Sequence, residues 1–377
     1  MFNSLSNYHD AKVFSDLFRN IKECCGRCFM DNSVLGSDIY PNVIRPVLKE
    51  FNRDSDYPVK LMVHASDVYR NIRSAVSGDS GENGSDCSSF TDAKILQIME
   101  DIGAGGCLFT FGEMGDCRNR RTAYLDRIFR DSFNRPVFVI TNSRTLASDL
   151  KLISSFESCR TKGITVIPLF GDTGSSADIS RYRLPSHDKS ILQNVSDRDT
   201  LALVDTNFFV HEKFYENVYS VIDSRNNDSR DNITVTLHQS NILELVKVGY
   251  EKPDLADSVD MVLHTINRDL RNHRNFKYGE GMATSFLDSD ILSTILLNMK
   301  DKNIVVFTQD GRLVNDIIRL NHIKSVRALS PVIAIGFDRF SDELGSLNYR
   351  DYSGFNYGRA CCYPTAEPGT SSPEAAA

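Results

Sequence analysis

The chain repeats itself at about half its length, and this repeat limits the folds open to it. Five short segments of the first half recur in the same order in the second half. The clearest pair is "VKLMVHASDVYRNIR" (59–73) with "ITVTLHQSNILELVK" (233–247), which aligns His64 with His238. The other pairs are "CFMDNSVL" (28–35) with "LVDTNFFV" (203–210), "NVIRPV" (42–47) with "NVYSVI" (217–222), "SFTDAKIL" (89–96) with "SFLDSDIL" (285–292), and "VFVITNSRTLASDL" (137–150) with "NIVVFTQDGRLVNDI" (303–317). Matches in one shared order predict two copies of one domain.

Each copy alternates short apolar runs with helical patterns. Runs such as "PVFVI" and "ITVTL" have strand length and β-branched residues, whereas "TDAKILQIMEDIG" and "DSDILSTILLNM" carry apolar residues at helical spacing. This alternation predicts an α/β protein with two tandem Rossmann-like, three-layer domains around central, mainly parallel sheets. We place the first domain at 1–172, a polar linker at 173–199, the second domain at 200–340 and a mostly disordered tail at 341–377.

Composition narrows the compartment and the partners. No apolar run reaches membrane-spanning length, and the first residues lack the basic flank and apolar stretch of a secretion signal. The nine cysteines are an odd number without the spacing of a disulfide scaffold. We therefore expect an intracellular protein, cytoplasmic or nuclear, without a membrane partner. Because the net charge is -7, a nucleic acid has to be bound by local basic patches.

The second copy places acidic residues where strands end and helices begin. Asp205 follows "LALV", Asp310 follows "NIVVFTQ", and Glu244 lies in the helix after "ITVTL", while Asp288 and Asp290 open the next helix. Any one of these acids alone is more simply a helix cap or a solvated surface residue. As a set, they meet at one edge of a parallel sheet, where clustered carboxylates require cations. Oxygen ligands select Mg²⁺ or Mn²⁺, and such a site is suited to phosphodiester hydrolysis.

The ordered blocks "VDTN", "ILEL", "LDSDIL" and "VVFTQDGRL" resemble the PIN domain, a metal-dependent nuclease fold, over most of 200–337. The resemblance implies that single-stranded RNA is the substrate and that Thr206 and Asn207 orient the first acid or hold the attacking water. It brings Thr308 into the site through the most family-like block. The acids that it implies as catalytic metal ligands are Asp205, Glu244, Asp288, Asp290 and Asp310. Spacing does not separate Asp288 from Asp290.

The first copy departs from this pattern. The matched segments align Asp31 with Asp205 and Asp92 with Asp288, but they place Arg70, Lys94 and Ser143 where the second copy has Glu244, Asp290 and Asp310. A nearby arginine or lysine competes with a metal ion for the two remaining acids. We therefore expect a degenerate PIN-like domain that has lost catalysis and either binds RNA or serves as a packing partner.

Two basic runs with interleaved aromatic residues are candidates for RNA binding, at 117–135 and 267–281. The residues singled out are Arg120, Arg121, Arg268, Arg271, Arg274 and Lys277. Arginine and lysine contact phosphates while aromatic rings stack on unpaired bases. The alternative is a solvated helix face with its aromatic side chains in the core, and the first run supports the two equally. The second run directly precedes the Asp288 helix, which favours a substrate-guiding loop.

These observations predict a metal-dependent endoribonuclease that hydrolyses single-stranded RNA in its second domain. The alternative is a catalytically inactive RNA-binding or scaffold protein in a larger RNA-processing complex. A DNA nuclease of related fold would need a helical arch or a helix-hairpin-helix, and neither pattern is present. The two copies are expected to pair within one chain or in a homo-oligomer.

Overall fold

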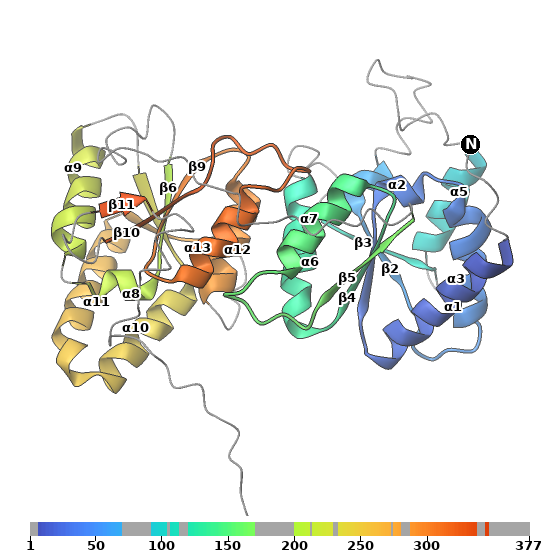
Figure 1. Ribbon diagram of the computed structural model, residues 1–377, viewed down its shortest axis with the longest axis horizontal. Helices are drawn as coiled ribbons and strands as arrows, with labels where there is room; N and C mark the ends of the chain where they lie inside the picture. Colours follow the sequence, from blue (N-terminus) through green and yellow to red (C-terminus); the bar gives the residue numbers. More distant parts are fainter. Residues whose placement is uncertain are drawn as a thin grey trace, which may run out of the picture.

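The computed structural model describes residues 7–69, 92–103, 106–112, 120–169, 200–211, 213–228, 233–272, 274–279, 287–337 and 344–346. They form two α/β units that lie side by side (Figure 1). The predicted linker and nearly all of the predicted tail lie outside these residues. Among the helices described here, none is long and apolar enough to cross a membrane.

The first unit is a sheet of five parallel strands in the order β3-β2-β1-β4-β5. Its strands are β1 (Arg27–Met30), β2 (Leu61–His64), β3 (Leu108–Phe111), β4 (Val137–Thr141) and β5 (Ile164–Pro168). Its helical segments are α1 (Asn7–Glu23), α2 (Asn32–Leu35), η1 (Tyr40–Ile44), α3 (Arg45–Asn52), α5 (Asp92–Ile102), α6 (Arg120–Asn134) and α7 (Arg144–Ser154). The apolar runs seen in the sequence are the central strands, because helices cover both faces of the sheet.

The second unit is a sheet of six strands in the order β11-β10-β9-β6-β7-β8. Its strands are β6 (Thr200–Val204), β7 (Ile233–Leu237), β8 (Phe276–Tyr278), β9 (Asn303–Phe307), β10 (Ile333–Phe337) and the antiparallel β11 (Leu344–Ser346). Its helical segments are α8 (Thr206–Phe209), η3 (Tyr215–Tyr219), α9 (Ser220–Asp228), α10 (Gln239–Glu251), η4 (Pro253–Leu255), α11 (Ala256–Arg271), α12 (Leu287–Asn298) and α13 (Gly311–Leu320).

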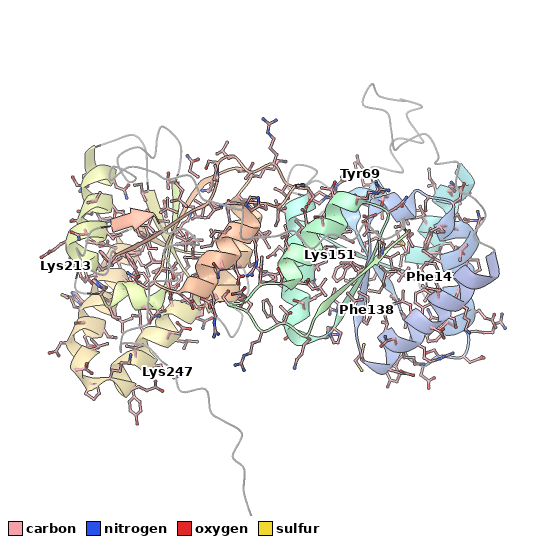
Figure 2. The ribbon with its side chains drawn as sticks, viewed as in Figure 1. Phe14, Tyr69, Phe138, Lys151, Lys213 and Lys247 are labelled. Atoms are coloured by element: carbon pink, nitrogen blue, oxygen red, sulfur yellow. The ribbon has the colours of Figure 1, made fainter. Side chains whose placement is uncertain are left out.

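The two sheets share one topology, which confirms the predicted fold class and explains the repeat. Strands β1 to β5 correspond in order to β6 to β10, with the first strand of each unit at the centre. Each unit also has a π-helical segment that is fixed by a tyrosine. Tyr40 donates to Asp101 at 2.9 Å, and Tyr219 donates to Asp269 at 2.5 Å. The side chains separate as in any folded domain: Phe14 and Phe138 are buried, whereas Lys151 and Lys247 lie outside (Figure 2).

One predicted alignment is wrong. Residues 89–96 were matched with 285–292, but the helix at 92–102 precedes β3, whereas α12 lies between β8 and β9. The helix between β3 and β4 is α6, so α6 is the counterpart of α12. The two similar segments both lie at the start of a helix, but these helices occupy different places in the fold. Asp92 and Lys94 therefore do not correspond to Asp288 and Asp290.

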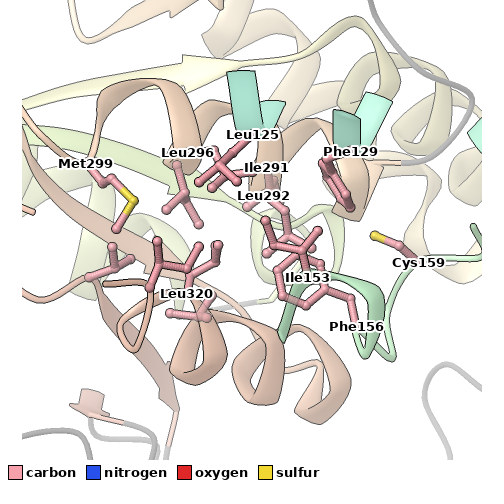
Figure 3. Close-up of a cluster of buried hydrophobic side chains, with 14 of the residues drawn as sticks. Leu125, Phe129, Ile153, Phe156, Cys159, Ile291, Leu292, Leu296, Met299 and Leu320 are labelled. Atoms are coloured by element: carbon pink, nitrogen blue, oxygen red, sulfur yellow. The ribbon is translucent and has the colours of Figure 1, made fainter. Parts of the chain in front are cut away.

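The two units pack against each other through these equivalent helices. Helix α6 lies on α12, and α7 lies on α13. Figure 3 shows the apolar side chains that fill this interface, with Leu125 and Phe129 of the first unit beside Ile291 and Leu292 of the second. All four are fully buried and belong to one continuous cluster that extends into both sheets. The chain therefore has a shared core between its two domains.

Two buried aspartates make the interface reciprocal. Asp149 on α7 accepts hydrogen bonds from the backbone amides of 324–325, at 2.9 and 2.6 Å. Asp316 on α13 accepts them from the backbone amides of 157–158, the shortest at 2.9 and 2.8 Å. Asp149 and Asp316 are 167 positions apart in the sequence, and so are the amides of 157–158 and 324–325. Ser293 and its hydrogen-bond partner Asp126 have the same separation. The interface thus follows an approximate two-fold axis, and the same separation pairs Arg121 with Asp288 and Ala123 with Asp290.

Candidate active site

Asp205 stands at the carboxyl end of the central strand of the second sheet. Every residue of β6 is buried, and Asp205, the next residue, is only 5% exposed. Thr308, which follows the neighbouring strand β9, donates its hydroxyl to the carboxylate of Asp205 at 2.9 Å. The amide of Asp310 donates to the same hydroxyl at 2.9 Å. Thr308 is itself fully buried, so it orients Asp205 from inside the protein.

Four acids from four elements act on one another at this edge. Burial raises the pKa of Asp205 to about 7, and the charges of Asp310 and Glu244 add to the shift. Hydrogen bonds from Thr308 and from the backbone of Asn207 oppose it. Burial also raises the pKa of Asp288, to about 9, with further contributions from Asp205, Asp310 and Glu244. The structure therefore brings together the four acids that the sequence placed at separate element ends.

The contacts distinguish Asp288 from Asp290. The charge of Asp288 is coupled to all three other acids of the edge. Asp290 is 4% exposed and accepts a hydrogen bond from Ser240 at 2.7 Å, which connects the start of α12 to the start of α10. It contributes to the raised pKa of Glu244, where burial is the main cause. Asp288 therefore faces three acids of the edge, whereas Asp290 is held by Ser240 and its charge acts on Glu244.

The donor chemistry of this edge fits a divalent cation. Asp205, Glu244, Asp288 and Asp310 offer only oxygen, the donor that Mg²⁺ and Mn²⁺ prefer. The buried hydroxyl of Thr206 lies beside Glu244, where its hydrogen bond counters part of the raised pKa of that acid. Across the residues that the structure describes, no three acids, histidines or cysteines already stand at metal-binding spacing. Binding an ion would therefore require these carboxylates to move closer together, and the charge of the ion would offset their repulsion.

The first domain surrounds the equivalent acid differently. Asp31 follows β1 and is 3% exposed. Its carboxylate accepts hydrogen bonds from the amides of Ser33 and Val34 at 2.8 and 3.3 Å, and from the hydroxyls of Ser33 and Thr141. These donors satisfy both carboxylate oxygens. Asp31 is thus a helix cap and a link between strands β1 and β4.

The other first-domain counterparts are not acids. Ser143 occupies the place of Asp310, and its hydroxyl accepts from the amide of Leu146 at 3.3 Å to cap α7. Arg121 occupies the place of Asp288. Arg70, which aligns with Glu244 in the sequence, lies outside the described residues. Among the first-domain counterparts of the four acids that the structure describes, only Asp31 is an acid.

The first basic run lies on α6, and the structure supports the helix-face alternative there. Tyr124 and Phe129, the aromatic residues proposed to stack on bases, are 2% and 0% exposed and pack in the core. Arg120 forms an ion pair with Asp67 at 2.6 Å. Asp67 was missed in the sequence because an isolated acid after a strand gives no distinguishing signal. Arg121 retains a position at the carboxyl edge of the first sheet.

The second basic run is divided between the core and the surface. Arg268 pairs with the buried Asp269 at 3.1 Å, and Phe276 is buried in the core. Arg271 lies exposed in the last turn of α11. Arg274 is also exposed, although it donates a hydrogen bond to Asn227.

Edge strand β8 presents the rest of this run beside the acids. Lys277 and Tyr278 are exposed, with Tyr278 at 57%. The register pairs Tyr278 with Leu237, the last residue of β7. Because these strands are parallel, Tyr278 lies at the same edge of the sheet as Asp205.

No family model, no curated protein and no solved structure matches this chain. The resemblance to the PIN domain therefore stays a prediction.

Proposed function

We propose that the chain is a metal-dependent endoribonuclease that hydrolyses phosphodiester bonds in single-stranded RNA at the carboxyl edge of its second sheet. The observation that carries this proposal is the set of four acids whose charges repel one another. Burying such a set lowers the stability of the folded chain unless a cation neutralises it. A divalent ion is the ligand that this arrangement favours.

The residues of the edge have distinct tasks in this proposal. Asp205, Glu244, Asp288 and Asp310 would hold Mg²⁺ or Mn²⁺, which when bound supplies an activated water and neutralises charge at the phosphate. Thr308 holds Asp205 in one orientation through its hydrogen bond. The bond from Ser240 to Asp290 fixes the start of α12, where Asp288 lies.

Exposed groups beside the acids support an unpaired strand as the substrate. Tyr278 is separated from Val204 by two strand spacings, roughly 10 Å, since β8, β7 and β6 are neighbours. A base that stacks on Tyr278 would leave its phosphate chain within reach of Asp205. Bases in a duplex are already stacked and do not offer that face. Lys277, the residue before Tyr278 in β8, is exposed and adds positive charge to this strand.

Cleavage of a labelled single-stranded RNA by the wild-type chain and by Asp205→Asn tests the proposal, in Mn²⁺, Mg²⁺ and EDTA. We expect cutting in either metal, none in EDTA, and a loss of at least about 100-fold in the variant, because a metal ligand matters more than its supporting residues. Asp31→Asn, the equivalent change in the first domain, is the control and should cut normally while folded. If the wild-type chain binds RNA but cuts nothing in either metal, the protein is an RNA-binding scaffold.

A further inference from the structure

The carboxyl edge of the first sheet carries basic residues where the carboxyl edge of the second sheet carries acids. At the helix start where the second domain has Asp288, the first has Arg121. Ser143 replaces Asp310, and the next residue, Arg144, is exposed. The two acids described at this edge are already engaged, Asp31 by its hydrogen bonds and Asp67 by Arg120 at 2.6 Å.

Arg121 lies in the first turn of α6, where its charge acts on Tyr124 and Asp149. The side chain is half-buried, and it makes no hydrogen bond or ion pair with any residue that the structure describes. A guanidinium has five N–H donors in a planar fork that matches two oxygens of a phosphate. Its removal from water without a partner is unfavourable, so a ligand that offers such oxygens would stabilise it.

Tyr124 provides a second, independent observation. Its side chain is 2% exposed, and within the described residues its hydroxyl has no hydrogen-bond partner. The Tyr124 ring stacks on Phe111, the last residue of β3, with 5.9 Å between the ring centroids, which places the side chain at the carboxyl edge of the sheet. A buried O–H without an acceptor costs about 1–3 kcal/mol. An anionic oxygen beside Arg121 would accept its hydrogen bond.

We infer that this edge of the first domain is a metal-free binding site for a phosphate of single-stranded RNA, held by Arg121 and Tyr124. The guanidinium supplies at this edge the positive charge that a divalent ion would supply at the other. Helices α2 and α8 follow the two central strands. In Figure 1, α2 lies at the top of the first unit and α8 lies low in the second unit, so the two edges open toward opposite sides of the molecule. The site therefore binds RNA independently of any cleavage in the second domain.

Fluorescence anisotropy of a labelled 20-nucleotide single-stranded RNA tests this site. The full chain carries Asp205→Asn and the buffer contains EDTA, so cleavage plays no part and a failed nuclease proposal does not affect the result. We expect Arg121→Ala to weaken binding about tenfold and to reduce the salt slope of log Kd by about one. Arg121→Lys should fall between, because it keeps the charge and loses the fork. Tyr124→Phe should weaken binding about threefold.

Arg53→Ala is the matched control, since Arg53 is an exposed arginine whose side chain is 67% exposed at the end of α3. It should leave both the affinity and the salt slope unchanged. Equal binding by Arg121→Ala, Arg121→Lys and the control, all shown folded by circular dichroism, would overturn the inference. Inorganic phosphate is titrated as a competitor. If the chain binds inorganic phosphate but does not bind the RNA, the assignment to RNA is overturned.

Discussion

The same aspartate has opposite roles in the two halves of this chain. Asp31 and Asp205 each follow the central strand of a sheet, and each accepts a hydrogen bond from the threonine that ends or follows the neighbouring strand. Around Asp31 the other neighbours are amides and hydroxyls that donate to it. Around Asp205 they include acids that repel it.

The comparison shows how one scaffold separates stability from chemistry. The strands, the π-helical segments and the interface helices are common to both domains, whereas the differences lie at helix starts on the edge of each sheet. Substitutions there, such as Arg121 for Asp288 and Ser143 for Asp310, alter charge without disturbing the core. An edge can therefore lose or keep an acid set while the fold stays the same.

Changes at the reciprocal interface are expected to have a large effect on the free energy of unfolding. Asp316 accepts from Arg319 at 2.5 Å and from Ser158 at 2.7 Å in addition to its backbone bonds. We expect Asp316→Ala to lower the free energy of unfolding by about 3 kcal/mol, because it leaves the buried Arg319 with only Glu157 as an ion-pair partner and leaves the amides of 157–158 without their acceptor. Asp149→Ala, which removes backbone bonds, should cost about 2 kcal/mol.

Urea unfolding measures both values, with exposed Asp301 changed to alanine as the control. No loss at either position would show that these aspartates do not hold the domains together. A larger loss at Asp149 than at Asp316 would contradict the expected order of the two contributions.

Matched asparagine substitutions should separate the two edges by the sign of their effect. In EDTA at pH 8, Asp31→Asn is expected to destabilise the chain by about 1–2 kcal/mol, because an amide nitrogen cannot accept the bonds that a carboxylate accepts. Asp205→Asn should stabilise it by on the order of 1 kcal/mol, because a repelled buried charge is removed while an acceptor for Thr308 remains. Thermal unfolding of the two variants against wild type gives the signs. If they agree, the contrast between the two edges is not electrostatic.

The pH dependence of unfolding should show the acid set directly. In the folded chain the pKa of Asp205 is raised from 3.8 to about 7, and that of Asp288 from 3.8 to about 9. Between these values the folded state binds more protons than the unfolded state, so stability falls as pH rises from about 4 to about 9. The double variant Asp205→Asn, Asp288→Asn should flatten this fall.

Urea midpoints at pH 5, 7 and 9 in EDTA measure the slope. The buried acids of the interface, Asp126, Asp149 and Asp316, also have raised pKa values and contribute the same slope to both proteins. An identical slope in the double variant would mean that the edge acids are not coupled in the way the structure implies.

The sequence predicted more of the fold than of the candidate site. Apolar runs and their order predicted two parallel sheets, because buried strands must be apolar wherever helices cover both faces. The correspondence of α6 with α12 was not predicted, because the residues that differ in charge between the two edges leave little local sequence similarity. For Tyr124 and Phe129 the sequence left base stacking and a place in the core equally open, since the basic residues between them obscure the apolar face of the helix. The hydrogen bond that distinguishes Asp290 from Asp288 comes from Ser240, which lies 50 residues away from Asp290 in the sequence and could not be paired with it from spacing.

The approximate two-fold axis has a consequence for how the two halves can differ. In a symmetric homodimer, any substitution appears at both equivalent positions, so an arginine in place of Asp288 would remove the acid from both edges at once. With both copies in a single chain, the contacts from Asp149 and Asp316 form at any dilution, because neither half can diffuse away. Each edge is then encoded separately, and one can specialise while the other is preserved.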